Sequence, residues 1–204
     1  MKSSILVLAA LSLGLSGLQA QTAPAVKVKV SAPKVINIQT PQFQAGNTPN
    51  RNWRPKEWLE FDTELQITLP PAAGGRNGSL SSMTVNYYVA LNAQTKDNKY
   101  HLLKGTINYV DVPAGERCHA LAYITPSTLR RILEKDQFTA ASDVKASAIE
   151  IVVDGQVVGG ETSIPGKWWE KTDAFEATEN VVLPRKETPF DILWGDYDLP
   201  TKSK

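Results

Sequence analysis

The feature that most constrains this chain is a strict alternation of apolar and polar residues over long segments. In residues 57–69, the apolar side chains are Leu59, Phe61, Leu65, Ile67 and Leu69. A period of two residues places these side chains on one face of a β-strand and the polar ones on the other. The Pro70-Pro71 pair ends the pattern, because proline cannot donate a sheet hydrogen bond. The segment therefore predicts a long strand with one buried face.

Further segments are strand-like and are bounded by turn-forming residues. They are 83–91, 100–112, 118–124 and 144–153, with shorter candidates at 156–160 and 181–183. Asp154-Gly155 predicts a hairpin turn, because both central residues of a type I′ turn need positive φ. One connecting helix is predicted, with Thr125 as its N-cap, Pro126 at its first position and an end near Asp136. Its apolar stripe is Leu129, Ile132 and Leu133.

Seven or eight strands joined mostly by short turns favour an antiparallel arrangement. No strand-helix-strand repeat is visible, which argues against a parallel α/β sheet. We predict an all-β fold, an antiparallel immunoglobulin-like β-sandwich with one short connecting helix. A small barrel, of the OB-fold or lipocalin kind, is the alternative.

The N-terminus carries the pattern of a secretory signal peptide in residues 1–20. Lys2 precedes an apolar run that ends at Leu18, and the small residue Ala20 follows. The run is too short for an ordinary transmembrane helix. We therefore expect export across the inner membrane, to the periplasm, the outer cell surface or the medium, and a mature chain that does not span a membrane.

Residues 21–56 form a basic, proline-rich arm ahead of the sandwich and its aromatic tail, residues 57–204. The arm has six basic residues, five prolines and no acidic residue, whereas the whole chain has a net charge of only +1. That balance argues against a nucleic-acid binder. Valines alternate with Lys27 and Lys29, which predicts an edge strand, paired either within the chain or with another copy. The two lysines would guide the arm to an acidic partner.

No pattern of residues predicts catalysis, a metal site or a cofactor. Cys118 and His119 are neighbours in one strand, so they point to opposite faces and cannot easily share a metal ion. Cys118 is expected to be a buried, inert thiol. Glu60, Asp62 and Glu64 share the polar face of a strand, and we expect that face to be solvated. The chain is therefore predicted not to be an enzyme.

The aromatic residues outside the predicted core are the candidates for binding. Rings in loops can cover a satellite core, anchor a protein interface or stack on sugars. Together with the two lysines of the arm, the predicted partner or glycan contacts are Trp53, Trp168, Trp169, Trp194, Tyr197, Lys27 and Lys29.

Several of these aromatic motifs resemble those of a known family. Lys167-Trp168-Trp169-Glu170, the run from Glu187 through Trp194 to Tyr197, and residues 52–60 are similar to exported pilus-like proteins of verrucomicrobial bacteria. That family is associated with a type IV pilus gene cluster. The resemblance implies an immunoglobulin-like fold and a structural or adhesive, host-contacting role, with pilus or envelope proteins as partners and possible self-association. The alternative is a small carbohydrate-binding module for mucin-type glycans.

Overall fold

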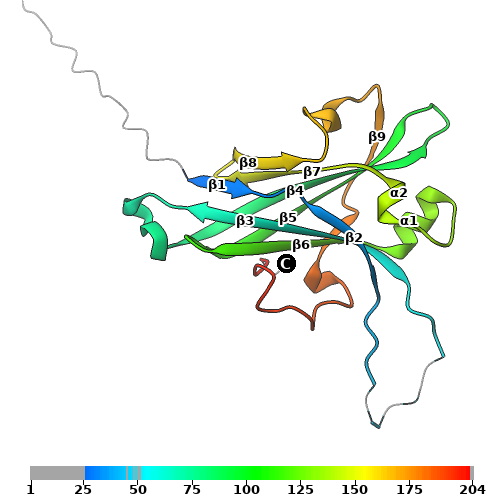
Figure 1. Cartoon of the computed structure of the whole chain (residues 1–204), viewed down its shortest axis with the longest axis horizontal. Coiled ribbons are helices and arrows are strands. Elements are labelled where there is room, and N and C mark those ends of the chain that lie inside the picture. Colours follow the sequence, from blue (N-terminus) through cyan, green and yellow to red (C-terminus); the bar gives the residue numbers. More distant parts are fainter. Residues whose placement is uncertain (1–25, 45, 48, 50–51, 203–204) are drawn as a thin grey trace, which may run out of the picture.

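The structure is a computed structural model that describes residues 26–44, 46–47, 49 and 52–202. The predicted signal peptide lies outside the described residues. Two five-stranded sheets pack face to face, with the body elongated along the strands (Figure 1). The predicted all-β sandwich is confirmed.

The first sheet is built around β3. Its order is β1-β3-β6-β10, and β2 also pairs with β3. Its strands are β1 (Lys27–Val30), β2 (Lys34–Gln39), β3 (Glu57–Thr68), β6 (Arg117–Ile124) and β10 (Val182–Pro184). β1 and β2 follow one edge of β3 in succession and are separated at Pro33, where the edge strand breaks. The predicted edge strand of the arm is thus present, and it pairs within its own chain.

The second sheet has the order β8-β7-β4-β5-β9. Its strands are β4 (Ser79–Gln94), β5 (Tyr100–Pro113), β7 (Val144–Val153), β8 (Gln156–Thr162) and β9 (Phe175–Thr178). The β7–β8 hairpin turns at Asp154 and Gly155, whose φ angles of 50° and 76° fit the predicted turn. β9 was not predicted, because four residues carry too little alternation to be recognised. It pairs in parallel with β5.

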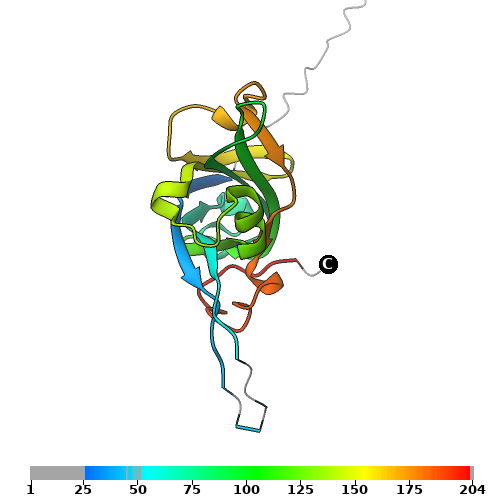
Figure 2. The same cartoon turned by 90° about the vertical axis from the view of Figure 1, so that its right-hand side faces the viewer.

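Two α-helices lie at one end of the sandwich, α1 (Pro126–Leu133) and α2 (Ala140–Asp143) (Figure 2). The Thr125 hydroxyl accepts a hydrogen bond from the Thr128 backbone N–H, as expected of an N-cap. Leu129 and Ile132 are buried, but Leu133 is only partly so. The helix ends before the predicted Asp136, because Glu134 adopts a left-handed conformation with φ of 54°.

Short 3-10 helices complete the chain. They are η1 (Pro71–Ala73), η2 (Gly75–Asn77), η3 (Trp168–Glu170) and η4 (Arg185–Glu187). η3 and η4 lie on opposite sides of the sandwich (Figure 1). Each stands at the start of a segment that covers one outer face of the sandwich.

The core between the sheets contains the alternating apolar residues that the sequence indicates, including Leu59, Phe61, Val85 and Tyr87. The sheets also approach each other at both edges. A Cβ atom on Gly105 would lie 2.5 Å from Val182 Cβ, where β5 meets β10. At the other edge, a Cβ atom on Gly159 of β8 would lie 3.3 Å from Val28 Cβ. Edge strands that lie this close to the opposite sheet are protected from indiscriminate pairing.

Candidate functional site

Both outer faces of the sandwich are covered by segments that carry aromatic rings. We call the outer face of β3 and β6, covered by residues 185–201, the tail face. We call the outer face of β4, β5 and β7, covered by residues 167–175, the tryptophan face. The covering segments lie on opposite sides of the molecule (Figure 1).

On the tryptophan face, the rings close a satellite core. Trp168 is 3% exposed and packs on Phe175, while its indole N–H donates to the Thr162 hydroxyl at 2.9 Å. Trp169 stacks on Tyr88 with ring centroids 4.9 Å apart. The Tyr88 hydroxyl donates to Glu150 at 2.7 Å, and Lys167 forms an ion pair with the same carboxylate. These rings seal a face on which the polar groups have partners.

On the tail face, a buried ion pair holds the tail. Arg185 Nε donates to Asp198 Oδ2 at 3.1 Å, and its Nη1 donates to the carbonyl groups of Asp191 and Leu193. Asp198 Oδ1 in turn accepts the backbone N–H of Leu121 on β6 at 2.9 Å. Burial raises the pKa of Asp198 to about 6, although Arg185 and the Leu121 N–H favour the charged form.

Phe190 is the apolar anchor of the tail. It is fully buried and stacks on Tyr123 at 4.7 Å, with Trp58 edge-on at 5.6 Å. The Trp194 ring also stacks on Phe190, with ring centroids 6.1 Å apart. Trp58 lies on the face of β3 that carries the polar residues of the alternation, and its burial is explained by the tail that covers this face.

A hollow of about 220 Å³ remains between the tail and the sheet, lined by Glu60, Asp62, Leu121, Trp194 and Tyr197. The Tyr197 hydroxyl donates to Asp62 Oδ2, and His119 Nδ1 contacts Asp62 Oδ1, both at 2.8 Å. The Tyr197 ring stacks on His119 with centroids 4.0 Å apart. Burial raises the pKa of Tyr197 to about 12, and Asp62 contributes to the increase. Both oxygens of Asp62 are therefore engaged.

Glu60, in contrast, has an oxygen without a partner. The residue is 7% exposed, and its Oε2 atom is buried with no hydrogen bond. Burial raises the pKa of Glu60, and the nearby Asp62 carboxylate adds to the increase, whereas Tyr123 and Lys34 oppose it. Tyr123, its cross-strand neighbour, also has a buried hydroxyl group without a hydrogen bond. The expectation of a solvated face is therefore wrong for Glu60, because the tail covers it.

The predicted contact residues do not form one surface. Trp53 is 48% exposed on the long β2–β3 hairpin, which extends away from the body (Figures 1 and 2). Trp168 and Trp169 belong to the tryptophan face, and Trp194 and Tyr197 to the tail face.

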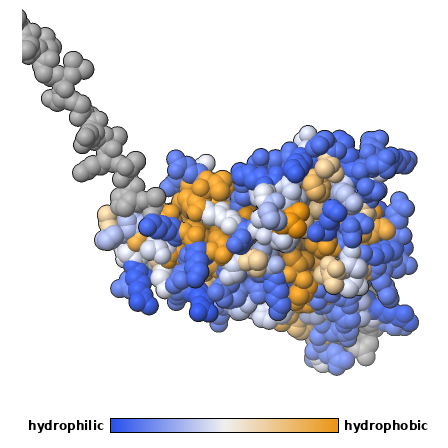
Figure 3. Space-filling model, turned by 45° about the horizontal axis from the view of Figure 1, so that its top comes forward, coloured by the Kyte–Doolittle hydropathy of each residue, from blue (hydrophilic) through white to orange (hydrophobic). Residues whose placement is uncertain are grey.

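The two predicted lysines lie on neither the hairpin nor the two covered faces. Lys27 and Lys29 are exposed on β1, at the edge of the first sheet. On the side of the molecule that carries β1 and β8, apolar side chains reach the surface in areas interrupted by polar ones (Figure 3).

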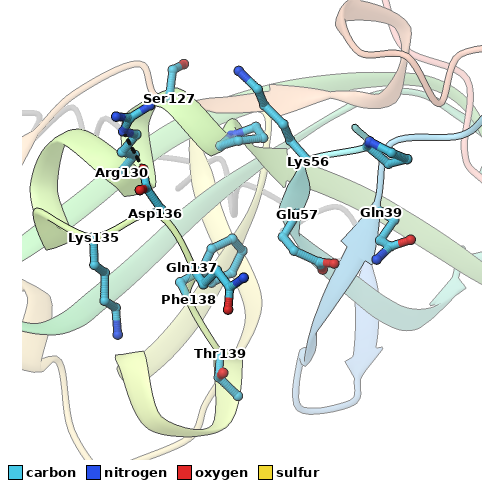
Figure 4. A pocket seen from close by; sticks show the side chains of 12 residues that line it. Gln39, Lys56, Glu57, Ser127, Arg130, Lys135, Asp136, Gln137, Phe138 and Thr139 are labelled. Carbon is cyan, nitrogen blue, oxygen red and sulfur yellow. Dashed lines mark ion pairs between the residues drawn. The ribbon is translucent and has the colours of Figure 1, made fainter. Parts of the chain in front are cut away.

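A larger groove of about 570 Å³ lies at the base of the hairpin (Figure 4). Lys56 and Glu57 line it from the hairpin, and α1 and the following segment line it from the other side. Arg130 and Asp136 form an ion pair of 3.0 Å across its rim, and both are largely exposed. Because its charges are mixed and solvated, this groove favours no particular ligand chemistry.

The structure shows Cys118 as a free, buried thiol, and burial raises its pKa. Among the described residues, no group of three or more His, Cys, Asp and Glu is placed to hold a metal ion. No helix among the residues that the structure describes is long and apolar enough to cross a membrane.

Comparison with known proteins places the chain in a family. A protein-family profile matches residues 19–204, nearly the whole chain. The chain belongs to that family. A crystal structure from Akkermansia muciniphila, a verrucomicrobium, is similar with a TM-score of 0.78 and 24% identity, over 88% of this chain and 95% of that chain. This similarity shows the fold. No curated protein sequence matches the chain.

Sequence reasoning selected Trp194 and Tyr197 but did not find the hollow beside them. Glu60 could have been singled out only by knowing that the tail returns to β3, more than a hundred residues earlier in the chain. Arg185 and Asp198, which hold the tail there, carry no local motif.

Proposed function

We propose that the chain is an exported, non-enzymatic protein of the cell surface with a structural or adhesive role, associated with pili and in contact with the host mucosa. The secretory pattern of residues 1–20 and the resemblance to verrucomicrobial pilus-like proteins support export and pilus association.

The observation that carries the proposal is the β2–β3 hairpin. It extends from the body and exposes Phe43 by 59% and Trp53 by 48% (Figure 2). Residues 40–56 contain basic but no acidic side chains. Exposed aromatic rings beside positive charge are typical of protein contact sites, where a few rings supply most of the binding energy.

The double variant Phe43→Ala/Trp53→Ala tests this role. Expressed in the source bacterium, it should be exported normally, but its cross-linking to envelope or pilus proteins and its adhesion to mucin-coated surfaces should fall several-fold. Val157→Ala is the matched control, because Val157 is an apolar side chain 57% exposed on β8. Equal capture by the wild-type chain and the double variant would contradict a contact role for the hairpin.

The alternative function is a small module that recognises mucin-type glycans. Trp194 and Tyr197, exposed by 40% and 44% beside two carboxylates, favour it, since rings and carboxylates together suit sugars. The wide separation of the tryptophans does not favour an extended sugar platform. Titration with mucin-derived oligosaccharides distinguishes the two functions, because a glycan module would lose binding in Trp194→Ala and keep it in the hairpin variant.

A further inference from the structure

The hollow on the tail face is lined by a buried carboxylate that the protein satisfies only in part, because Tyr123 and Lys34 favour the charged form of Glu60 but no hydrogen bond reaches its Oε2 atom. The Glu60 residue is only 7% exposed, and its Oε2 atom is buried and has no hydrogen bond. A buried carboxylate without a partner is costly, and proteins normally pair such a group or bind a counter-charge to it. Asp62 cannot be that partner, because it is negative too; each of its oxygens has one contact within the protein and a second lone pair that can accept another hydrogen bond.

The rings of the hollow are held in place at some conformational cost. Trp194 has φ of 57°, a left-handed conformation that bulky residues rarely adopt. Its carbonyl group accepts the backbone N–H groups of Tyr197 and Asp198, both at 3.0 Å, and this turn brings both rings to the hollow. His119 supports Tyr197 from behind by stacking. Such strain persists where the surrounding structure fixes it, often at binding sites.

We infer that this hollow is a binding site for an alkylammonium group, of the kind that a lysine side chain of a protein partner carries. The ammonium group donates hydrogen bonds to Glu60 and Asp62, and the alkyl chain and the charge lie against the Trp194 and Tyr197 rings. The Cα atoms of alternate residues on a strand are about 6.5–7 Å apart. Carboxylate oxygens at the ends of two such side chains can approach within the roughly 5.5 Å that one ammonium nitrogen spans with two hydrogen bonds. Aromatic rings beside carboxylates attract such cations through their π faces.

Other occupants fit the hollow less well. The described acidic and histidine side chains do not form a metal cluster. A neutral sugar hydroxyl would satisfy one oxygen of Glu60 but would leave its negative charge uncompensated. Lys34 lies opposite Asp62 in the β2–β3 register and favours the charged form of Glu60, but among the described residues it forms no ion pair with either carboxylate.

Binding can be measured on the mature chain by NMR titration with Nα-acetyl-lysine amide, following the indole N–H signal of Trp194. We expect a saturable shift that n-butanol, a neutral probe of similar length, does not produce. N-acetylgalactosamine serves as the sugar probe. A saturable shift with this sugar and none with the ammonium probe would overturn the inference in favour of the glycan alternative, and no saturable shift with any probe would overturn it outright.

Two carboxyl variants separate the site from general surface charge. Glu60→Gln keeps the shape of the side chain and should weaken ammonium binding at least about tenfold, the effect of losing a charge-assisted hydrogen bond. Glu64→Gln is the matched control on the same face, because Glu64 pairs with the exposed Arg117 and does not line the hollow. Its affinity should stay within about twofold of the wild type. Equal losses in the two variants, or unchanged binding in Glu60→Gln, would overturn the inference.

This inference is independent of the proposed role of the hairpin. The Phe43→Ala/Trp53→Ala variant should bind the ammonium probe as the wild type does, since neither residue lines the hollow. Failure of the hairpin experiment and failure of the titration are therefore distinguishable.

Discussion

The two outer faces of the sandwich are covered in the same way but differ in what the covering leaves behind. On the tryptophan face, the buried Glu150 carboxylate is paired with the Tyr88 hydroxyl and with the exposed Lys167, beside the stacked rings of Tyr88 and Trp169. On the tail face, the rings leave a hollow beside Glu60. Glu60 and Tyr123 each have a buried polar atom without a hydrogen bond. Aromatic residues therefore close a satellite core on one face and border an open hollow on the other.

The largest expected effect tests whether the tryptophan face is core. Trp168→Ala should lower the free energy of unfolding by about 3–5 kcal/mol, because it removes a buried ring and leaves a cavity. Chemical denaturation of the purified chain measures this difference. A loss below about 1 kcal/mol would mean that the face is not a satellite core.

The next test uses the pH dependence of the tail anchor. The pKa of Asp198 rises from 3.8 to about 6 on folding, so the folded state favours the protonated acid. Its contribution to stability is therefore fully present below about pH 4 and is lost as the pH rises past about 6.

Comparison with Asp198→Asn isolates this group, because other titrating groups contribute equally to both chains. The stability of the wild type relative to the variant should fall by about 2–3 kcal/mol between about pH 4 and pH 7. Denaturation curves at the two pH values give the difference. A constant difference, or one of opposite sign, would contradict the raised pKa.

A smaller and more direct contrast comes from one carboxylate on each face. Glu60→Gln should raise the free energy of unfolding by up to about 1 kcal/mol at neutral pH, because it removes a buried charge without a partner. Glu150→Gln should lower it by about 1–2 kcal/mol, because it weakens the contacts to Tyr88 and Lys167. Changes of the same sign would remove the distinction between the faces.

The smallest effect is expected at Trp194. In Trp194→Gly, the lost stacking on Phe190 is offset by relief of the left-handed backbone, since glycine adopts positive φ without strain. The free energy of unfolding should change by less than about 1 kcal/mol. A much larger loss in thermal or chemical denaturation would make Trp194 a structural ring like Trp168.

Much of the fold follows from local pattern. The alternation in residues 57–69 predicts β3, the Asp154-Gly155 pair predicts the turn between β7 and β8, and Thr125 with Pro126 predicts the start of α1. Each depends on neighbours in sequence, where backbone geometry and side-chain period act directly. β9 was missed for the opposite reason, since four residues become a strand only by pairing with β5.

The candidate site was predicted only in part. Trp194 and Tyr197 stand out as aromatic residues outside the core pattern, but the same criterion selected Trp168, which is buried. Burial outside the main core depends on which segment returns to which face, and residue type does not specify this.

The sequence predicts an all-β fold with a basic, proline-broken edge strand and a tail rich in aromatic rings, because strand period and proline chemistry are local properties. It left a small barrel as the alternative to the sandwich, and the pairing of distant strands into two sheets excludes that barrel. The tertiary structure alone decided that Arg185 and Asp198 hold the tail against β6, and that Glu60 thereby becomes a buried carboxylate beside two rings. The physical reason is that desolvation of a charge is set by what folds over it, and here the covering segment comes from the far end of the chain.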